Sequence, residues 1–280
     1  VSVLDLLKGI IIQSGNDATV ALAEYVGGTE DGFVDLMNSY AASMGLSNTL
    51  FQNSTGLPDG NHFSSAKDLA TMTSLLINNF PETYSLYKEK YFTFNNIRQP
   101  NRNRLLWKDN SSDGVKTGHT ESAGYCLISS AKRNDMRLIA VVAGAKSDKE
   151  RFNDTQRLLE YGFRFYSTQE VIKKDNALKD VDVWGGKKNL VSLGSENNIK
   201  LTLPRTTFKN ITISYDFQNN LRAPIKEGQT LGTLVIKDGE KTLHTENLVA
   251  LNDVEAKGFF GRLWASLVLW FRGLFGLGDA

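Results

Sequence analysis

The spacing of apolar residues changes along the chain, and this change limits its fold more than any other feature. Residues 1–90 carry helical spacing, whereas residues 91–145 carry short apolar, β-branched runs. Two of these runs meet at Asn134-Asp135 and predict a hairpin. A helix over about 148–165 follows, and helices around an antiparallel sheet make an α+β domain. The predicted helices of the first part begin near Ser2, at Asp17, at Glu30 and after Ser65.

Short turn signals and strands dominate the chain after the 148–165 helix. From about Gln169, runs of alternating apolar and polar residues are separated by Gly and Asn, which predicts a small all-β domain. The clearest runs are 199–203, 211–215 and 231–236. The expected organisation is therefore a domain over 1–168, an all-β domain over 169–255 and a terminal segment over 256–280.

The terminal segment 256–280 has an amphipathic, aromatic-rich pattern. At helical spacing one face collects Phe260, Leu263, Trp264, Leu267, Val268, Phe271, Leu274 and Phe275. Arg262 and Arg272 lie on the other face, and each would cost roughly 2.5–3.5 kcal/mol at the centre of a bilayer. A helix lying in the membrane surface leaves both arginines at the headgroups, so we favour it over a helix packed on the β-domain.

Composition excludes several classes of function. The net charge of +1 gives no overall field for nucleic acid. A single cysteine allows no intrachain disulfide, and the three histidines lack metal-ligand spacing. We therefore expect no metal, no other cofactor and no nucleic-acid partner.

Two short motifs indicate chemistry. Lys116-Thr117-Gly118 precedes an apolar strand, so we expect it on an edge strand that adds an extended peptide while Lys116 and Thr117 reach its carboxylate. Gly118 and Gly124 are expected to let the substrate backbone approach. Ser14-Gly15-Asn16 falls between two helices. Asp17 is the expected N-cap there, which leaves Ser14 and Asn16 free to face a cleft.

Longer strings around these motifs carry a family resemblance. Residues 5–18, 101–107 and 114–125 closely resemble the low-molecular-mass penicillin-binding proteins that are D-alanyl-D-alanine carboxypeptidases. The resemblance continues through the β-domain and the terminal amphipathic segment. It implies an α+β penicillin-binding, β-lactamase-like domain with helices around an antiparallel sheet. The Gly of Ser-Gly-Asn and His119 fit this family better than class A β-lactamases.

The resemblance also implies roles for particular residues. Ser14 would pass a proton to the leaving D-alanine, and Asn16 would bond the substrate amide. The His119 backbone N–H would form one arm of the oxyanion hole. Arg151 is expected to assist carboxylate binding, with a solvated helix residue as the alternative. The expected substrate-binding set is Lys116, Thr117, Gly118 and Arg151.

The nucleophile of the family belongs to a Ser-x-x-Lys motif that precedes the Ser14 motif. Three such pairs occur here, near the number expected by chance, and all follow Ser14: Ser64/Lys67, Ser85/Lys88 and Ser129/Lys132. We therefore expect a chain truncated at its N-terminus, without the nucleophile, its lysine or an export signal. Two alternatives to a carboxypeptidase remain, namely a non-catalytic membrane-surface fragment that binds stem peptides, and a β-lactamase.

The expected partners follow from the resemblance. They are peptidoglycan pentapeptide stems as substrate, β-lactam antibiotics as inhibitors, and the membrane surface through residues 256–280. The expected location is the periplasmic face of the bacterial inner membrane.

Overall fold

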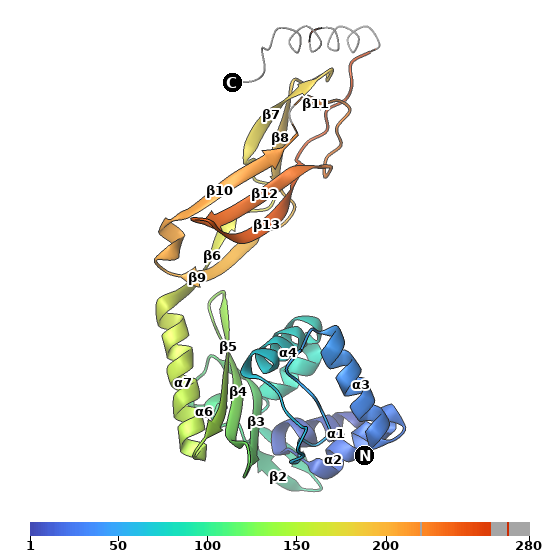
Figure 1. The fold of residues 1–280 in the computed structure, drawn as a ribbon, viewed down its shortest axis with the longest axis vertical. Coiled ribbons are helices and arrows are strands. Elements are labelled where there is room, and N and C mark those ends of the chain that lie inside the picture. The colour runs from blue at the N-terminus through green and yellow to red at the C-terminus, as the bar shows by residue number, and fades with distance from the viewer. Residues whose placement is uncertain (219, 259–267, 269–280) are drawn as a thin grey trace. The chain divides into compact units, whose positions relative to one another are not determined.

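The chain divides into two compact units, Val1–Phe165 and Tyr166–Ala280. The computed structural model describes residues 1–218, 220–258 and 268. Each unit is described by itself below (Figure 1).

The helices of the first unit begin and end where local chemistry dictates. Ser2 and Ser65 each act as an N-cap, because each side chain accepts a hydrogen bond from a backbone N–H three residues on. Gly45 adopts φ +71° just beyond the third helix, and a glycine in this left-handed conformation ends a helix. The elements are α1 Val3–Lys8, a π-helix Gly9–Gln13, α2 Asn16–Gly27, α3 Glu30–Ser43, α4 Ala66–Asn79, α5 Pro81–Tyr84 and a 3₁₀-helix Ser85–Lys88.

The start of α2 differs from the prediction. Its N-cap is Gly15, and Asp17 lies in the first turn, where its carboxylate accepts from the N–H of Ala18 and from no other described backbone N–H of the helix. The helix begins earlier because Ser14 turns the chain in the left-handed conformation, with φ 59°, directly after the π-helix. Asp17 as the N-cap was therefore wrong, and Asn16 is the first residue of α2.

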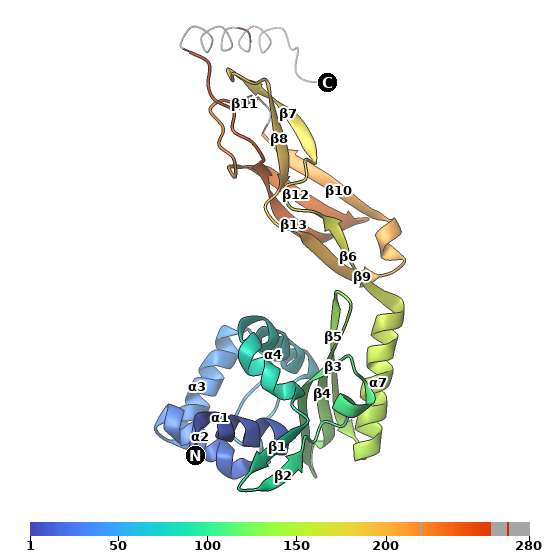
Figure 2. The ribbon, with the colours of Figure 1, turned by 180° about the vertical axis from the view of Figure 1, so that it is seen from behind.

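A three-stranded antiparallel sheet forms the centre of the first unit, in the order β3-β4-β5. The predicted hairpin at Asn134-Asp135 is confirmed and joins β4 to β5. Helix α7 packs on one side of this sheet, while α4 contacts β5 from the other (Figures 1 and 2). The elements are β1 Tyr91–Phe94, β2 Ile97–Pro100, α6 Leu105–Lys108, β3 Ser112–Thr120, β4 Gly124–Arg133, β5 Met136–Ala145 and α7 Asp148–Phe165.

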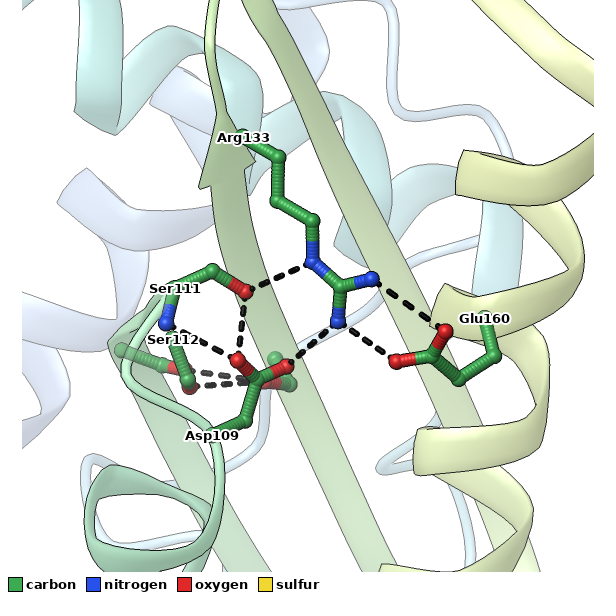
Figure 3. A network of polar contacts seen from close by, with 7 residues as sticks. Asp109, Ser111, Ser112, Arg133 and Glu160 are labelled. Carbon is green, nitrogen blue, oxygen red and sulfur yellow. Dashed lines mark hydrogen bonds and ion pairs between the residues drawn. The ribbon is translucent and has the colours of Figure 1, made fainter.

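A polar network fixes α7 to the sheet (Figure 3). Arg133 at the end of β4 bonds both oxygens of Glu160 on α7 and, at 3.2 Å, the carboxylate of Asp109. Ser111 donates to the same Asp109 carboxylate. The Arg133 guanidinium also lies over the ring of Phe163, 4.3 Å from its centre. One arginine therefore joins the loop after α6, the sheet and α7.

The second unit is the predicted all-β domain. Its main sheet has the order β10-β12-β13-β8-β7-β11, and β6 pairs with β9 beside it. Its core is aliphatic, and Val191, Leu193, Leu234, Ile236 and Leu248 are fully buried. The strands are β6 Tyr166–Ile172, β7 Lys179–Trp184, β8 Leu190–Ser195, β9 Ile199–Pro204, β10 Ile211–Phe217, β11 Leu221–Arg222, β12 Thr230–Asp238 and β13 Lys241–Ala250.

The predicted amphipathic helix falls almost wholly outside the described residues, so the structure leaves it as a prediction. In the part of the chain that is described, no helix is long and apolar enough to cross a membrane.

An apolar hollow of about 740 Å³ lies among the helices of the first unit. Its lining includes large apolar side chains that stay exposed to solvent, among them Val26, Leu36, Tyr40 and Phe80. Exposed apolar surface of this kind marks a place that another segment or molecule covers.

Candidate active site

The two sequence motifs meet in the folded chain. Lys116, on β3, donates a hydrogen bond from its ammonium to the hydroxyl of Ser14. Ser14 closes the π-helix, and its N–H bonds the carbonyls of Gly9 and Ile10. A π-helix that ends in a left-handed serine is uncommon, and both features concentrate at functional sites. The fold thus holds the Ser14 hydroxyl against β3.

Among the described strands, β3 pairs with β4 alone, so it is an edge strand, as predicted. Its first half is fixed by Asp113, which accepts from Tyr84 at 2.6 Å and binds Arg137 through both carboxylate oxygens at 2.8 Å. Its second half carries Lys116, whose ammonium also donates to the Thr117 carbonyl at 2.9 Å. The motif therefore stands at a rigid, unpaired sheet edge.

The environment of Lys116 makes its ammonium unusually acidic. Burial, followed by the charges of Arg102 and Arg151, lowers the pKa of Lys116 from 10.5 to about 8. At pH 7 the group is still mostly protonated, so it can hold an anion. It can also release its proton far more readily than an ordinary lysine.

Arg102 also belongs to this site, although it was not among the predicted site residues. Its Nε donates to the Gln13 carbonyl at 2.8 Å, one residue before Ser14. The sequence feature that could have indicated Arg102 is the Asn-Arg-Asn-Arg string at 101–104. Asn101 and Asn103 are buried and bond the main chain, so the Arg102 side chain between them points outward. The result is that Arg102 and Arg151 both place positive charge near Lys116.

The two glycines assigned to substrate approach differ from each other. A Cβ on Gly118 would touch only the Cβ of Cys126, at 3.8 Å, so Gly118 leaves open space at the strand edge. Gly124 instead has φ +66°, and a Cβ there would lie 2.9 Å from the Ala145 carbonyl. Gly124 is thus required by the β3–β4 connection and β5, and its expected role in substrate approach is not supported.

The remaining expected site residues surround this edge. Thr117 is buried within β3, and the ring of His119 lies against that of Tyr125 with 3.9 Å between centres. Asn16 is exposed at the start of α2, two residues after Ser14. The structure therefore bonds the Lys116 ammonium to both the Ser14 hydroxyl and the Thr117 carbonyl. Asn16 and His119 each lie two residues further along the chain, after Ser14 and Thr117 respectively.

Arg151 is not a solvated helix residue. It is only 7% exposed, and it donates to the carbonyls of Gly118, at 2.9 Å, and Cys126, at 3.3 Å. Its other terminal nitrogen bonds Asp148, which also pairs with Arg104 at 3.0 Å. Both terminal nitrogens of Arg151 are therefore engaged with the chain itself.

Comparison with known families matches both units. The model described as "D-alanyl-D-alanine carboxypeptidase" matches residues 1–147, and the "Penicillin-binding protein 5, C-terminal domain" model matches residues 166–256. The first match covers more than half of the chain. The chain belongs to the D-alanyl-D-alanine carboxypeptidase family.

Relatives agree with this membership. D-alanyl-D-alanine carboxypeptidase DacC of Escherichia coli is 49% identical over 278 residues, which are 99% of this chain and 70% of that protein. The crystal structure of penicillin binding protein 5 from Haemophilus influenzae is similar with a TM-score of 0.77 and 42% identity, over 91% of this chain and 75% of that one.

A third similarity concerns a β-lactam complex. Penicillin-binding protein D2 of Listeria monocytogenes, solved in its ampicillin-bound form, is 35% identical with a TM-score of 0.55, over 58% of this chain and 68% of that one. These names favour the carboxypeptidase hypothesis over the β-lactamase and the non-catalytic fragment.

Proposed function

We propose that this carboxypeptidase family member removes the terminal D-alanine from peptidoglycan stem peptides through a serine acyl-enzyme and is inhibited by β-lactams. The hydrogen bond from Lys116 to Ser14 at the unpaired edge of β3 carries this proposal. It joins a carboxylate-binding cation to a hydroxyl that can pass a proton.

The substrate is an extended peptide that ends in a carboxylate. Its backbone adds to the free edge of β3 next to Gly118, which has no side chain of its own and where an added Cβ would meet only the Cβ of Cys126. Lys116 and Thr117 hold the terminal carboxylate, and the positive charge of Arg102 lies close enough to Lys116 to lower its pKa. The positive charges of Lys116 and Arg102 favour an anionic chain end here. Asn16 bonds the substrate amide.

The proton follows a short route. The attack of a serine on the carbonyl of the penultimate D-alanine forms an ester and releases the last residue as an amine, which must gain a proton. The Ser14 hydroxyl donates this proton, and Lys116, which already bonds the Ser14 oxygen, supplies the replacement. The attacking serine loses its own proton as its oxygen bonds the carbonyl, and that proton returns to Lys116, so the net transfer is one proton from the serine to the amine. Water then adds its oxygen to the acyl carbon and gives a proton back to the serine, which releases the shortened peptide as a carboxylic acid.

We place the nucleophile in a Ser-x-x-Lys motif outside residues 1–280. The three pairs within the chain are each held elsewhere: Ser64 bonds Thr49 at 2.8 Å, Ser85 donates to the Glu82 carbonyl at 2.6 Å, and Ser129 is fully buried against Gly114. The curated relatives are also longer, since the chain spans 70% of DacC.

The experiment compares this chain with the intact gene product. A fluorescent penicillin should label the intact protein covalently, and a peptide ending in D-alanyl-D-alanine should lose one D-alanine. Residues 1–280 alone should take no label. Labelling of the short chain would overturn the placement of the nucleophile, and an intact protein that neither labels nor releases D-alanine would overturn the proposed function.

The apolar hollow gives a second test of that placement. We propose that the segment carrying the nucleophile packs into it, because its lining combines exposed apolar side chains with little polar surface. A dye that fluoresces on apolar surfaces should bind residues 1–280 strongly and the intact protein weakly. Equal binding to both would exclude the hollow as the docking place.

We further propose that the protein works at the periplasmic face of the bacterial inner membrane, held by residues 256–280. The opposite apolar and arginine-bearing faces of this segment support its attachment to a membrane surface, and the periplasmic location follows from the family resemblance alone. Deletion of residues 257–280 should release the protein from anionic lipid vesicles. Retention of the deleted form on vesicles would refute the anchor and leave the proposed chemistry intact.

A further inference from the structure

The buried arginine of α7 contacts one peptide unit that matters for the proposed reaction. Arg151 donates to the Gly118 carbonyl at 2.9 Å. The same peptide unit carries the N–H of His119, which the family resemblance implies as one arm of the oxyanion hole. A planar trans peptide points its carbonyl and its N–H in opposite directions. Whatever holds the carbonyl of Gly118 therefore also aims the N–H of His119.

The direction of that N–H follows from a second contact. The same Arg151 nitrogen lies 3.3 Å from the carbonyl of Cys126, which is the partner of Gly118 across the β3–β4 ladder. The Gly118 carbonyl thus faces β4. The N–H of His119 consequently faces the other side, which is the unpaired edge of β3 where the substrate is proposed to lie.

Arg151 is itself held by an ion-pair relay. Its second terminal nitrogen bonds one oxygen of Asp148, the first residue of α7, and the other oxygen of Asp148 pairs with Arg104 at 3.0 Å. Burial of a guanidinium without a counter-charge is unfavourable, so the Asp148 carboxylate stabilises Arg151 in its buried position. Arg104 is largely exposed, so its pair contributes less than the contact between Asp148 and Arg151.

We propose that Arg151, oriented by Asp148, is a positioning residue that aims and polarises the His119 N–H as an oxyanion donor. This inference rests on the proposed function. A charged donor on the carbonyl draws electron density from its peptide group and makes the N–H a stronger donor. It differs from the expectation that Arg151 binds the substrate carboxylate, because the terminal nitrogens of Arg151 contact Gly118, Cys126 and Asp148.

Nuclear magnetic resonance tests the positioning without any need for catalysis. The chain holds three histidines, so a sample labelled with ¹⁵N-histidine gives three backbone amide signals, from His62, His119 and His244. Asp148→Asn and Arg151→Lys should move the His119 amide proton upfield and leave the other two signals in place. A His119 signal that stays put in both variants overturns the proposal.

The control is a matched pair on the same helix. Asp154 and Arg157 of α7 form an ion pair with the same three-residue spacing, but the arginine side chain is 82% exposed. Asp154→Asn should leave all three histidine signals unchanged. Thermal unfolding checks that each variant is folded, and Asp148→Asn, which alters a partly exposed side chain, keeps the test available if Arg151→Lys does not fold.

Acylation of the intact protein separates the two roles of Arg151. Loss of a whole oxyanion donor costs about 10²–10³-fold in rate, so a misaimed donor should cost roughly tenfold. Arg151→Lys should slow acylation by penicillin and by its uncharged methyl ester to the same extent. A loss seen only with the free acid would show carboxylate binding and overturn the proposal. If neither penicillin nor its methyl ester acylates the wild type, the proposed function is wrong. The shift of the His119 amide signal in the variants would still test whether Arg151 positions that N–H.

Discussion

The ammonium of Lys116 bonds the hydroxyl of Ser14 across 102 positions of sequence. This contact joins a π-helix that ends in a left-handed serine to the free edge of a three-stranded sheet. The two residues depend on each other, because a hydroxyl that donates its proton must receive another one, and a lysine of ordinary pKa is a weak proton donor. Burial lowers the pKa of Lys116, so Lys116 can supply that proton to Ser14.

Removal of the Ser14 hydroxyl should break this route. Ser14→Ala in the intact protein should lower kcat for D-alanine release by about a hundredfold, because a positioned acid–base group contributes about 10²–10⁴-fold. KM should change little, since Lys116 and Thr117 keep the carboxylate. Ser43→Ala, an exposed serine on α3, is the matched control. A rate within twofold of wild type would remove Ser14 from the proton route.

The pH dependence should follow Lys116. Its pKa of about 8 means that the ammonium is present below that pH and is lost as the pH rises through it. The kcat/KM for a carboxylate-bearing peptide should therefore fall above pH 8. Arg102→Gln removes a charge that lowers this pKa, so the falling limb should move to higher pH. If the falling side of the pH profile of kcat/KM is the same in Arg102→Gln as in wild type, the group that titrates is not Lys116.

The two glycines should separate stability from activity. Gly118→Ala meets no close neighbour and should leave the melting temperature unchanged, yet its methyl group enters the proposed substrate edge and should lower kcat/KM by about a hundredfold. Gly124→Ala forces an alanine to φ +66° beside the Ala145 carbonyl and should destabilise the fold by about 1–3 kcal/mol. If Gly118→Ala lowered the melting temperature and Gly124→Ala did not, the assignments of Gly118 to substrate access and of Gly124 to stability would both be wrong.

Sequence spacing predicted the elements of the fold because local signals define them. Ser2, Gly45 and Ser65 mark helix ends through their own hydrogen bonds or conformation. The predicted start of α2 was wrong because the chain makes a left-handed turn at Ser14 directly after a π-helix. The residue preferences at helix N-caps carry no information about a preceding π-helix.

Within the site, the sequence predicted the residues of the two motifs and not the residues that surround them. The edge position of Lys116 followed from a polar motif before an apolar strand, whereas the contribution of Arg102 depends on a loop that two buried asparagines hold. The burial of Arg151 could not be inferred from its own helix, because its partners are carbonyls of β3 and β4. Long-range contacts of this kind have no local sequence signature.

Acid stability should depend on Arg133. Hydrogen bonding to Arg133 lowers the pKa of Glu160, and although burial alone would raise the pKa of Asp109, bonds from Ser111 and Arg133 lower it overall. At a pH above the ordinary pKa values of 4.5 and 3.8, both carboxylates therefore stabilise the fold, and this contribution is lost as the pH falls through their lower pKa values in the folded chain.

Arg133→Met should be less stable than wild type at pH 7, and the difference in unfolding free energy should narrow toward pH 3. Arg157→Met, which removes an exposed pair of α7, should change neither quantity. A difference between Arg133→Met and wild type that is independent of pH would show that Arg133 acts through its packing on Phe163 instead.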